Sequence, residues 1–324
     1  MTRNSLFILL LFLLFFPLSS WAAILYLEPS SSGYYQGDTF LVDVRIDTQG
    51  ECINTVEAEL SFTNNILEIK DFSQGNSLLS LWTKEPEFSN ETGLVSFSGG
   101  IPGGYCGELA GDPGKSNLLG RIIFQVYKSP LMNKPINTRV EFSENSYVLL
   151  HDGLGTKASL ITKGALLSIL SGIPELPRQE WQELLKGDTI IPESFLIILE
   201  RNPVVFEGKY FITFSTTDKQ TGIAHYEVQE GEKEWKRADS PYLLEEQGLS
   251  DTIRVKAIDK SGNEYVAEYV PAAGKIKPLF YWIISLIILV GAGLIWLKKK
   301  KQRKDSTLPH DEPAQENHYE ENKW

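Results

Sequence analysis

A stretch of nineteen uncharged residues, beginning at Leu279 and ending at Leu297, constrains this chain more than any other feature. As a helix rising 1.5 Å per residue it reaches about 28 Å, close to the bilayer's hydrocarbon thickness of about 30 Å. The basic run KKKKQRK follows it directly. Because basic clusters stay on the cytoplasmic side, the stretch at 279–297 predicts a single membrane-spanning helix, with the preceding part of the chain outside the cell.

A second apolar block lies at the other end, over residues 6–18, between Arg3 and the small-residue sequence SSWAA. A basic start, a short apolar stretch and small residues at a cleavage site are typical of a secretory signal peptide. We therefore expect residues 1–22 to be removed after Ala22 or Ala23. An uncleaved N-terminal anchor is the alternative, but the block is short for a membrane span.

The charge of the chain is divided unevenly. Its 324 residues contain 31 Lys+Arg and 42 Asp+Glu, for a net charge of -11. The polar tail at 298–324 contains more basic than acidic residues, so the acidity belongs to the exported part. This distribution argues against a nucleic-acid partner. We expect the tail to be disordered and cytoplasmic.

Residues 24–170 read as short strands separated by Gly, Asn, Asp and Pro. In TFLVDVRID, at 39–47, alternate residues are apolar, and the same period recurs in TVEAELSF, at 55–62. A period of two is the signature of half-buried strands. Many such strands without a convincing amphipathic helix predict an all-β fold, a β-sandwich of jelly-roll type.

Several blocks of this region occur in an order that resembles the cohesin domain. They are LYLEPSSSGYYQGDTFLVDVRIDTQGECINTVEAELSF, SLLSLWTKEPEF, GLVSFSGGIPGGYCGE, LLGRIIFQV and SYVLLHDGLGT. Cohesins are jelly-roll modules that bind dockerins in cellulosomes. The resemblance implies a dockerin-like protein partner held on one sheet face, and a link to polysaccharide degradation. It assigns no individual contact residue.

Cys52 and Cys106 are the only cysteines of the chain, and both lie in the exported part. Outside the cytoplasm an even pair usually forms a disulfide, which here stabilises by roughly 4 kcal/mol through its closed loop. Two free buried thiols are the alternative. The chain has no C-x-x-C motif that would indicate zinc or thioredoxin chemistry.

An exposed aromatic strip would support a different function, direct binding of carbohydrate by the jelly roll. Tyr34, Tyr35, Trp82 and Tyr105 are the candidates for stacking on sugar rings. Packing in the core is the alternative for Trp82, because an apolar run precedes it. A third hypothesis is a structural envelope protein whose head mediates only self-association.

A connector at 171–194 follows, and a second module occupies 195–273. Trp181, Leu184 and Leu185 are spaced three and four apart, which predicts a short helix at 176–186 ending at Gly187. Alternation in IAHYEVQE and TIRVKAID predicts a smaller sandwich. Residues 204–270 resemble a fibronectin type III or bacterial immunoglobulin-like module, which implies a spacer.

The exported part contains no motif of a known catalytic device. His151 and His225 fall in different modules, and G-x-S-x-G, H-E-x-x-H and the P-loop sequence do not occur. We therefore expect a binding protein and no enzyme. We also expect no cofactor; Asp218 and Asp259 offer oxygen ligands for a structural calcium ion, but turn formation is the better explanation of both.

Overall fold

The computed structural model describes residues 22–107, 117–127, 134–172 and 174–305. The expected signal peptide lies outside them except for its last residue, and the expected tail lies outside them beyond Asp305. The chain divides into two compact units, Met1–Glu245 with Ile253–Tyr269 and Glu246–Thr252 with Val270–Trp324. Each unit is described by itself. Strands dominate the first unit, which confirms the all-β prediction.

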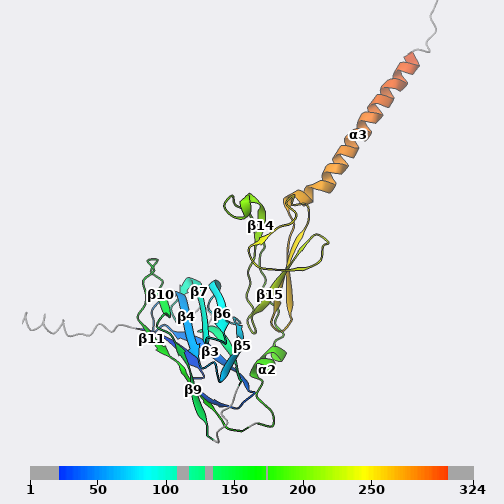
Figure 1. Ribbon diagram of the computed structural model, residues 1–324. Coiled ribbons are helices and arrows are strands. Elements are labelled where there is room, and N and C mark those ends of the chain that lie inside the picture. Colours follow the sequence, from blue (N-terminus) through cyan, green and yellow to red (C-terminus); the bar gives the residue numbers. More distant parts are fainter. Residues whose placement is uncertain (1–21, 108–116, 128–133, 173, 306–324) are drawn as a thin grey trace, which may run out of the picture. The chain divides into compact units, whose positions relative to one another are not determined.

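The strands between Ala23 and Ile169 form two sheets, and we call this part of the chain the head (Figure 1). The smaller head sheet has the order β11 (Leu160–Lys163), β1 (Ala23–Glu28), β3 (Thr39–Asp47), β8 (Leu118–Val126) and β5 (Leu67–Ser73). The larger head sheet has the order β2 (Ser31–Tyr34), β12 (Ala165–Ile169), β9 (Ile136–Phe142), β4 (Ile53–Phe62), β7 (Leu94–Tyr105) and β6 (Leu81–Ser89), and β10 (Tyr147–Leu150) also pairs with β4. Most neighbouring strands are antiparallel, as in a jelly roll.

One core lies between the two head sheets. Along β4, Val56, Ala58 and Leu60 are fully buried and point into it, while the residues between them point outward. Aromatic rings join the layers: Phe124 of β8 lies 5.4 Å from Phe62 of β4, measured between ring centroids. Each sheet has one side in the core and one side that faces outward. This is why apolar residues alternate with polar ones along the strands.

The glycine-rich stretch around Pro102 forms part of a strand. β7 continues through it to Tyr105. At Gly99 a Cβ atom would lie 3.0 Å from the Leu79 Cβ and 3.1 Å from the Leu81 carbonyl oxygen. Because glycine has no Cβ atom, Leu79 and Leu81 can pack closely against β7 at this position.

The connector contains a helix, α2 (Glu180–Gly187), which begins four residues later than expected. It lies against the head through β3. The Thr39 N–H donates to the Arg178 carbonyl, and the Leu41 N–H donates to Glu180 Oε2 at 3.0 Å. The Trp181 side chain is 6% exposed. The connector is therefore docked on the smaller head sheet, where β1 leaves the start of β3 unpaired.

The second module has two small sheets of its own. One contains β13 (Ile198–Arg201), β14 (Tyr210–Thr213) and β17 (Tyr242–Leu243); the other contains β16 (Lys236–Ala238), β15 (Ile223–Glu230), β18 (Ile253–Asp259) and β19 (Glu264–Tyr269). A 3-10 turn, η1 (Phe206–Gly208), precedes β14. Val228, Val255 and Ile212 are buried in this module. Its strands alternate as the sequence predicts.

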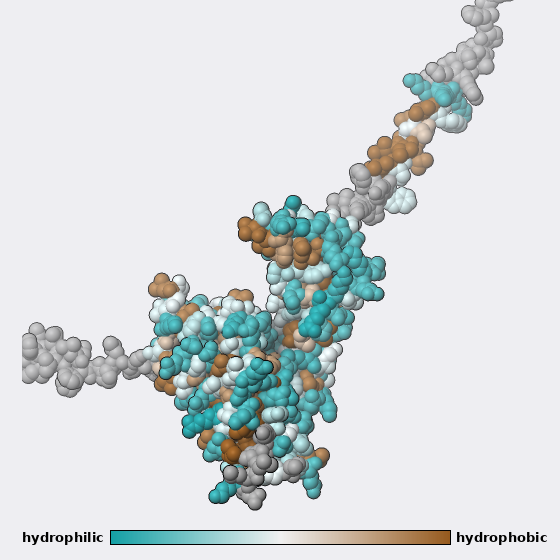
Figure 2. Space-filling model, in the orientation of Figure 1, coloured by the Kyte–Doolittle hydropathy of each residue, from teal (hydrophilic) through white to brown (hydrophobic). Residues whose placement is uncertain are grey.

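The second unit contains α3 (Ala272–Asp305), a helix of 34 residues. Within it, Trp282–Lys300 is long and apolar enough to cross a membrane, by length and composition. Figure 2 shows apolar side chains along α3 and a hydrophilic segment after them. The apolar stretch in the sequence is thus a single continuous helix.

Candidate functional site

The outward side of the larger head sheet is the best candidate for a binding surface. We call it the open face and define it by the outward side chains of four adjacent strands, β6, β7, β4 and β9: Leu81, Leu94, Ser96, Ser98, Glu57, Glu59, Arg139 and Glu141. The alternation of each strand places them there, because their neighbours in sequence are in the core. Pairing within the sheet then sets their spacing.

Small polar and acidic residues meet at the centre of the open face. Glu57 lies directly opposite Ser98, and Glu59 lies opposite Ser96. On the β6 side, Lys84 Nζ donates to Ser96 Oγ at 2.9 Å. Serines opposite carboxylates make this part of the sheet polar and rich in hydrogen-bond acceptors.

Hydrogen bonds keep the Glu59 carboxylate charged. Ser143 Oγ donates to Glu59 Oε1 at 2.8 Å, and Asn145 Nδ2 donates to the same oxygen at 2.9 Å. These bonds lower the pKa of Glu59 below its usual value. A hydrogen bond with Glu57 raises the pKa of the nearby Tyr147 phenol. The two carboxylates thus form a fixed acceptor pair.

Exposed apolar side chains also gather on the larger head sheet. Among the described residues of the head, its strands carry five large ones that are exposed, whereas the smaller head sheet carries one, Ile161. The five are Leu81, Phe88, Leu94, Ile136 and Leu166. Phe88 is opposite the buried Val95 and Ile136 is opposite the buried Ile169, so the register places these two on the core side of the sheet. Leu81, Leu94 and Leu166 are on the open-face side, and apolar residues beside a polar centre are typical of a protein-binding surface.

The smaller head sheet is occupied differently. Its outward residue Asp43 is paired with two arginines: Arg121 Nε lies 2.6 Å from Asp43 Oδ1, and Arg45 Nη2 lies 2.8 Å from Asp43 Oδ2. The connector with Trp181 lies against the same sheet. Its charged groups therefore satisfy one another, and part of the sheet already has a partner within the chain.

The two cysteines are joined in the structure. Cys52 precedes β4 and Cys106 follows β7, and their sulfur atoms form a disulfide. Since β4 pairs with β7, the bond closes one end of the strands that carry the open face. The His151 N–H donates to the Cys52 carbonyl at the same end.

The four aromatic residues named as stacking candidates do not form one strip. Tyr34 is buried and stacks on Phe40 at 3.7 Å between ring centroids. Tyr105 is also buried, and its hydroxyl donates to the Gly107 carbonyl. Tyr35 is half-buried beside Tyr34. Burial removes Tyr34 and Tyr105 from contact with a sugar, which corrects the expectation for these two residues.

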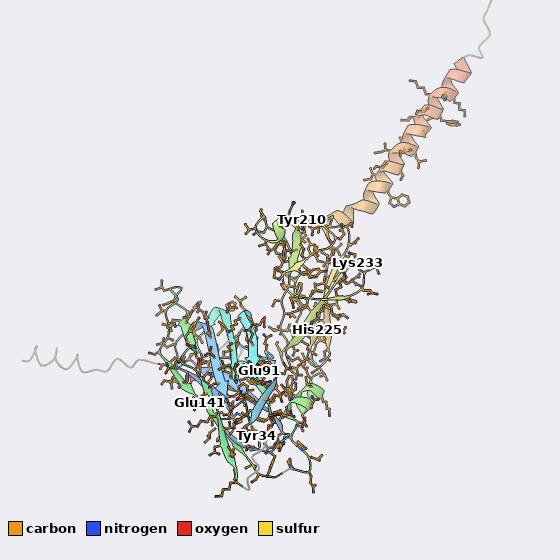
Figure 3. All side chains as sticks on the ribbon, viewed as in Figure 1. Tyr34, Glu91, Glu141, Tyr210, His225 and Lys233 are labelled. Carbon is orange, nitrogen blue, oxygen red and sulfur yellow. A yellow bond between two sulfur atoms is a disulfide. The ribbon has the colours of Figure 1, made fainter. Side chains whose placement is uncertain are left out.

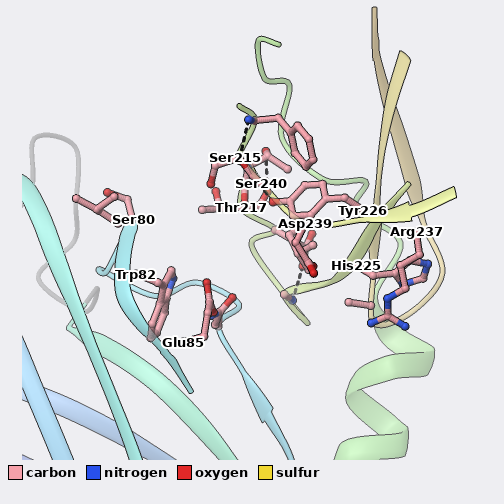
Figure 4. A pocket seen from close by; sticks show the side chains of 18 residues that line it. Ser80, Trp82, Glu85, Ser215, Thr217, His225, Tyr226, Arg237, Asp239 and Ser240 are labelled. Atoms are coloured by element: carbon pink, nitrogen blue, oxygen red, sulfur yellow. Dashed lines mark hydrogen bonds between the residues drawn. The ribbon is translucent and has the colours of Figure 1, made fainter. Parts of the chain in front are cut away.

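Trp82 is half-buried and contacts both the core of the head and a surface cavity. Its ring packs against the core, with centroids 6.3 Å from Phe72 and 5.9 Å from Phe97. Its outer part borders a cavity of about 510 Å³ that Glu85, Arg237 and residues of β15 also line (Figure 4). Trp82 is the one stacking candidate at this cavity.

The histidines are far apart in the topology. His225 lies on β15 of the second module (Figure 3). His151 directly follows β10 of the head. His225 Nε2 lies 3.7 Å from Glu227 Oε1 on its own strand. The structure does not bring them together.

The sequence had not singled out the acceptor pair Glu57 and Glu59. The signal was nevertheless present, because alternation within 55–62 places both glutamates on the side opposite to Val56, Ala58 and Leu60. Choosing that side as a surface required the strand order, which places β4 between β7 and β9.

Solved structures similar to this chain include several cohesin domains. The OlpC cohesin–dockerin complex of Clostridium thermocellum is 10% identical and covers 46% of this chain and 94% of that chain, with a TM-score of 0.36. The seventh ScaB type I cohesin of Pseudobacteroides cellulosolvens is 14% identical and covers 49% and 98%, with a TM-score of 0.35. The solution structure of CaCohA2 from Clostridium acetobutylicum is 14% identical and covers 48% and 95%, with a TM-score of 0.37.

No protein-family model and no curated protein matches the chain. The jelly-roll fold of the head is established by its own strand pairing. The similarity to cohesin domains extends over about half of this chain.

Proposed function

We propose that this protein is a membrane-anchored extracellular scaffold whose head binds a protein partner through the open face. A dockerin-like partner is the class favoured by the resemblance of the sequence, and dockerins are the partners named in several complexes of the similar cohesins. The second module serves as a spacer of fibronectin type III or immunoglobulin-like type. The membrane places the binding head at the cell surface.

The unequal occupation of the two head sheets is the observation that carries this proposal. The smaller head sheet holds the connector and a closed set of ion pairs around Asp43. The larger one presents the exposed apolar residues Leu81, Leu94 and Leu166 on the same side as the acceptor pair Glu57 and Glu59. A partner that carries Lys or Arg beside apolar side chains fits such a surface.

The orientation follows from the two ends of the chain. The basic run beginning at Lys298 comes directly after the apolar part of α3, and basic clusters stay in the cytoplasm. A cleaved signal peptide at 1–22 delivers the N-terminal part to the outside. The scaffold is thus a single-pass protein with a short cytoplasmic tail.

Retention of secreted proteins by the immobilised full-length chain tests the proposal. The protein, in detergent, is incubated with the secreted proteins of its own cell, and retained proteins are identified by mass spectrometry. Washing with soluble polysaccharide separates direct carbohydrate binding from protein binding. We expect a dockerin-like protein to remain bound after this wash. Retention of polysaccharide without any protein would favour the carbohydrate receptor instead.

Two matched substitutions locate the surface. Leu94→Asp changes an apolar residue of the open face that is 42% exposed, and Ile161→Asp changes one of the smaller head sheet that is 49% exposed. We expect Leu94→Asp to weaken retention about tenfold or more and Ile161→Asp to leave it unchanged. Equal effects of the two variants contradict the assignment of the open face.

A further inference from the structure

We propose that Asp188, Asp218 and Asp259 form a calcium site at the end of the second module next to the connector. Each offers a carboxylate oxygen, and these oxygens all lie within 4.8 Å of one another. The three residues come from separate places in the sequence: Asp188 directly follows α2, Asp218 lies between β14 and β15, and Asp259 ends β18. All three are buried.

One oxygen of each carboxylate is used by its own turn. Asp218 Oδ1 accepts the N–H groups of Gln220, Thr221 and Gly222. Asp259 Oδ1 accepts those of Ser261 and Asn263, and Asp188 Oδ1 accepts that of Ile190. These bonds hold the carboxylates in place. They account for the hydrogen bonding of only one oxygen, Oδ1, in each carboxylate.

The second oxygen of Asp218 has no partner. Asp218 is 1% exposed, and its Oδ2 atom is buried without a hydrogen bond. The corresponding oxygens of the neighbours have donors: Thr221 Oγ1 donates to Asp188 Oδ2, and Asn263 Nδ2 donates to Asp259 Oδ2. An orphaned buried carboxylate oxygen is costly, and so are three buried carboxylates side by side.

No basic side chain offsets this charge within the described part of the chain. The two lysines that directly follow these aspartates are paired elsewhere: Lys260 Nζ lies 2.6 Å from Asp71 Oδ1 of the head, and Lys219 Nζ lies 2.6 Å from Glu193 Oε1. A cation among the three carboxylates supplies both the missing partner and the missing positive charge. Turn formation, the simpler explanation from the sequence, accounts for neither.

The ligand set selects calcium. All three groups are hard oxygen donors, and calcium bonds such oxygens at about 2.3–2.6 Å, so two ligands on opposite sides of the ion lie roughly 5 Å apart. Oxygens within 4.8 Å of one another can therefore share one calcium ion. Magnesium requires shorter bonds of about 2.0–2.1 Å in a near-ideal octahedron, which three carboxylates fixed by separate turns do not readily provide.

A calcium ion at this site restricts the motion of the connector relative to the second module. It links the connector, through Asp188, to two loops of the second module. The same loops contact the head: Ser73 Oγ donates to the Thr221 carbonyl at 2.7 Å, and the Asn76 N–H donates to the Asp218 carbonyl at 3.2 Å. Calcium binding should therefore make both loops, which contain Asp218 and Asp259, more ordered.

Calcium titration of the full-length protein in detergent, after treatment with EDTA, tests the site. Isothermal titration calorimetry gives stoichiometry, and hydrogen exchange with mass spectrometry reports the backbone around Asp218 and Asp259. We expect one calcium ion per chain, slower exchange in both loops, and a melting temperature raised by about 5 °C at saturating calcium. Magnesium at the same concentration should produce a smaller change.

Asp218→Asn is the decisive variant, because an asparagine Oδ1 still accepts the three turn hydrogen bonds. We expect calcium affinity to fall about tenfold or more, and the calcium-free protein to melt no lower than the wild type because one buried charge is gone. Asp259→Asn should behave in the same way. The control is Asp152→Asn, since Asp152 caps a turn of the head by accepting the Leu154 N–H; calcium affinity should not change.

Two results would overturn the proposal. The first is wild-type protein whose exchange and melting temperature do not respond to millimolar calcium, an outcome that needs no variant to fold. The second is Asp218→Asn and Asp259→Asn proteins that fold and bind calcium as the wild type does.

Discussion

Asp43 on β3 and Arg121 on β8 form a two-point ion pair across adjacent strands, with Nε 2.6 Å from Oδ1 and Nη2 3.2 Å from Oδ2. Arg45, two residues further along β3, places its Nη2 atom 2.8 Å from Oδ2 of the same carboxylate. One acidic group thus holds two cations on the outward side of the smaller head sheet. Two parallel hydrogen bonds give this pairing a fixed geometry.

Replacing Asp43 should therefore cost more than replacing an ordinary surface charge. We expect Asp43→Ala to lower the free energy of unfolding by about 2–3 kcal/mol, because Arg121 loses the carboxylate it is paired with and Arg45 keeps only the exposed Glu28. Urea unfolding of the full-length protein, followed by tryptophan fluorescence, measures this. Glu141→Ala is the control: it breaks the exposed Arg139–Glu141 pair and should cost less than about 1 kcal/mol. Equal costs would contradict the structural role of Asp43.

The disulfide between Cys52 and Cys106 should contribute strongly to the stability of the head. It closes a loop with a sequence separation of 54 residues, for which chain entropy gives roughly 4 kcal/mol. We expect dithiothreitol to lower the melting temperature of the wild type. The doubly substituted protein, Cys52→Ser with Cys106→Ser, should melt lower at the start and be insensitive to dithiothreitol. A wild type that is equally insensitive, with free thiols detected by alkylation, contradicts the bond.

The pKa of Glu59 predicts a pH dependence with a definite sign. Its pKa is lowered in the folded protein by the hydrogen bonds from Ser143 and Asn145, from a usual value of 4.5. Its contribution to stability is therefore present above pH 4.5 and is lost as the pH falls through the lowered pKa. We expect the difference in unfolding free energy between the wild type and Glu59→Gln to be larger at pH 7 than at pH 3. A difference that grows on acidification contradicts the assignment.

Docking of the connector depends on Trp181, which is 6% exposed. Truncation of a buried tryptophan typically costs about 3–5 kcal/mol, so Trp181→Ala should lower stability strongly and speed hydrogen exchange at the start of β3. Leu176 lies in the same connector and is 87% exposed. Leu176→Ala should change stability by less than about 0.5 kcal/mol. If both variants behave alike, the connector is not held by its tryptophan.

The sequence was most informative where one side of a strand is buried and the other is not. The expected strand at 39–47 coincides with β3, since its alternation reflects the core directly. β6 could not be bounded in this way, because Pro86 and two register shifts against β7 interrupt its period. Stacking roles for Tyr34 and Tyr105 could not be judged either, because a ring in the core and a ring on the surface share the same sequence signal.

The candidate sites depend on contacts between distant residues. Asp218 and Asp259 are recognisable from their turns, but Asp188 joins them only through the fold. The choice of the open face depends on which sheet the connector occupies, and the docking of α2 depends on the free start of β3. Local patterns do not contain that information.

Gly120 on β8 supports a last prediction, because the ring of Phe72 lies directly over it. A Cβ atom at Gly120 would overlap Phe72 Cζ, so Gly120→Ala forces the ring to move within the core. We expect a loss of about 2 kcal/mol in unfolding free energy, in the range of overpacked cores. At Gly100 the nearest atoms to an added Cβ lie 3.7 Å away or more, and Gly100→Ala should be nearly neutral.

The matched second-site change is Phe72→Leu, which shortens the side chain that Gly120→Ala strikes. On the wild-type background it should be destabilising, because a cavity replaces part of the ring. Combined with Gly120→Ala it should cost less than the sum of the two single changes by about 1 kcal/mol, since residues in contact are coupled. A double-mutant cycle in urea measures this coupling. Strict additivity would mean that the ring does not lie on Gly120, and that the packing of β5 against β8 differs from the structure described here.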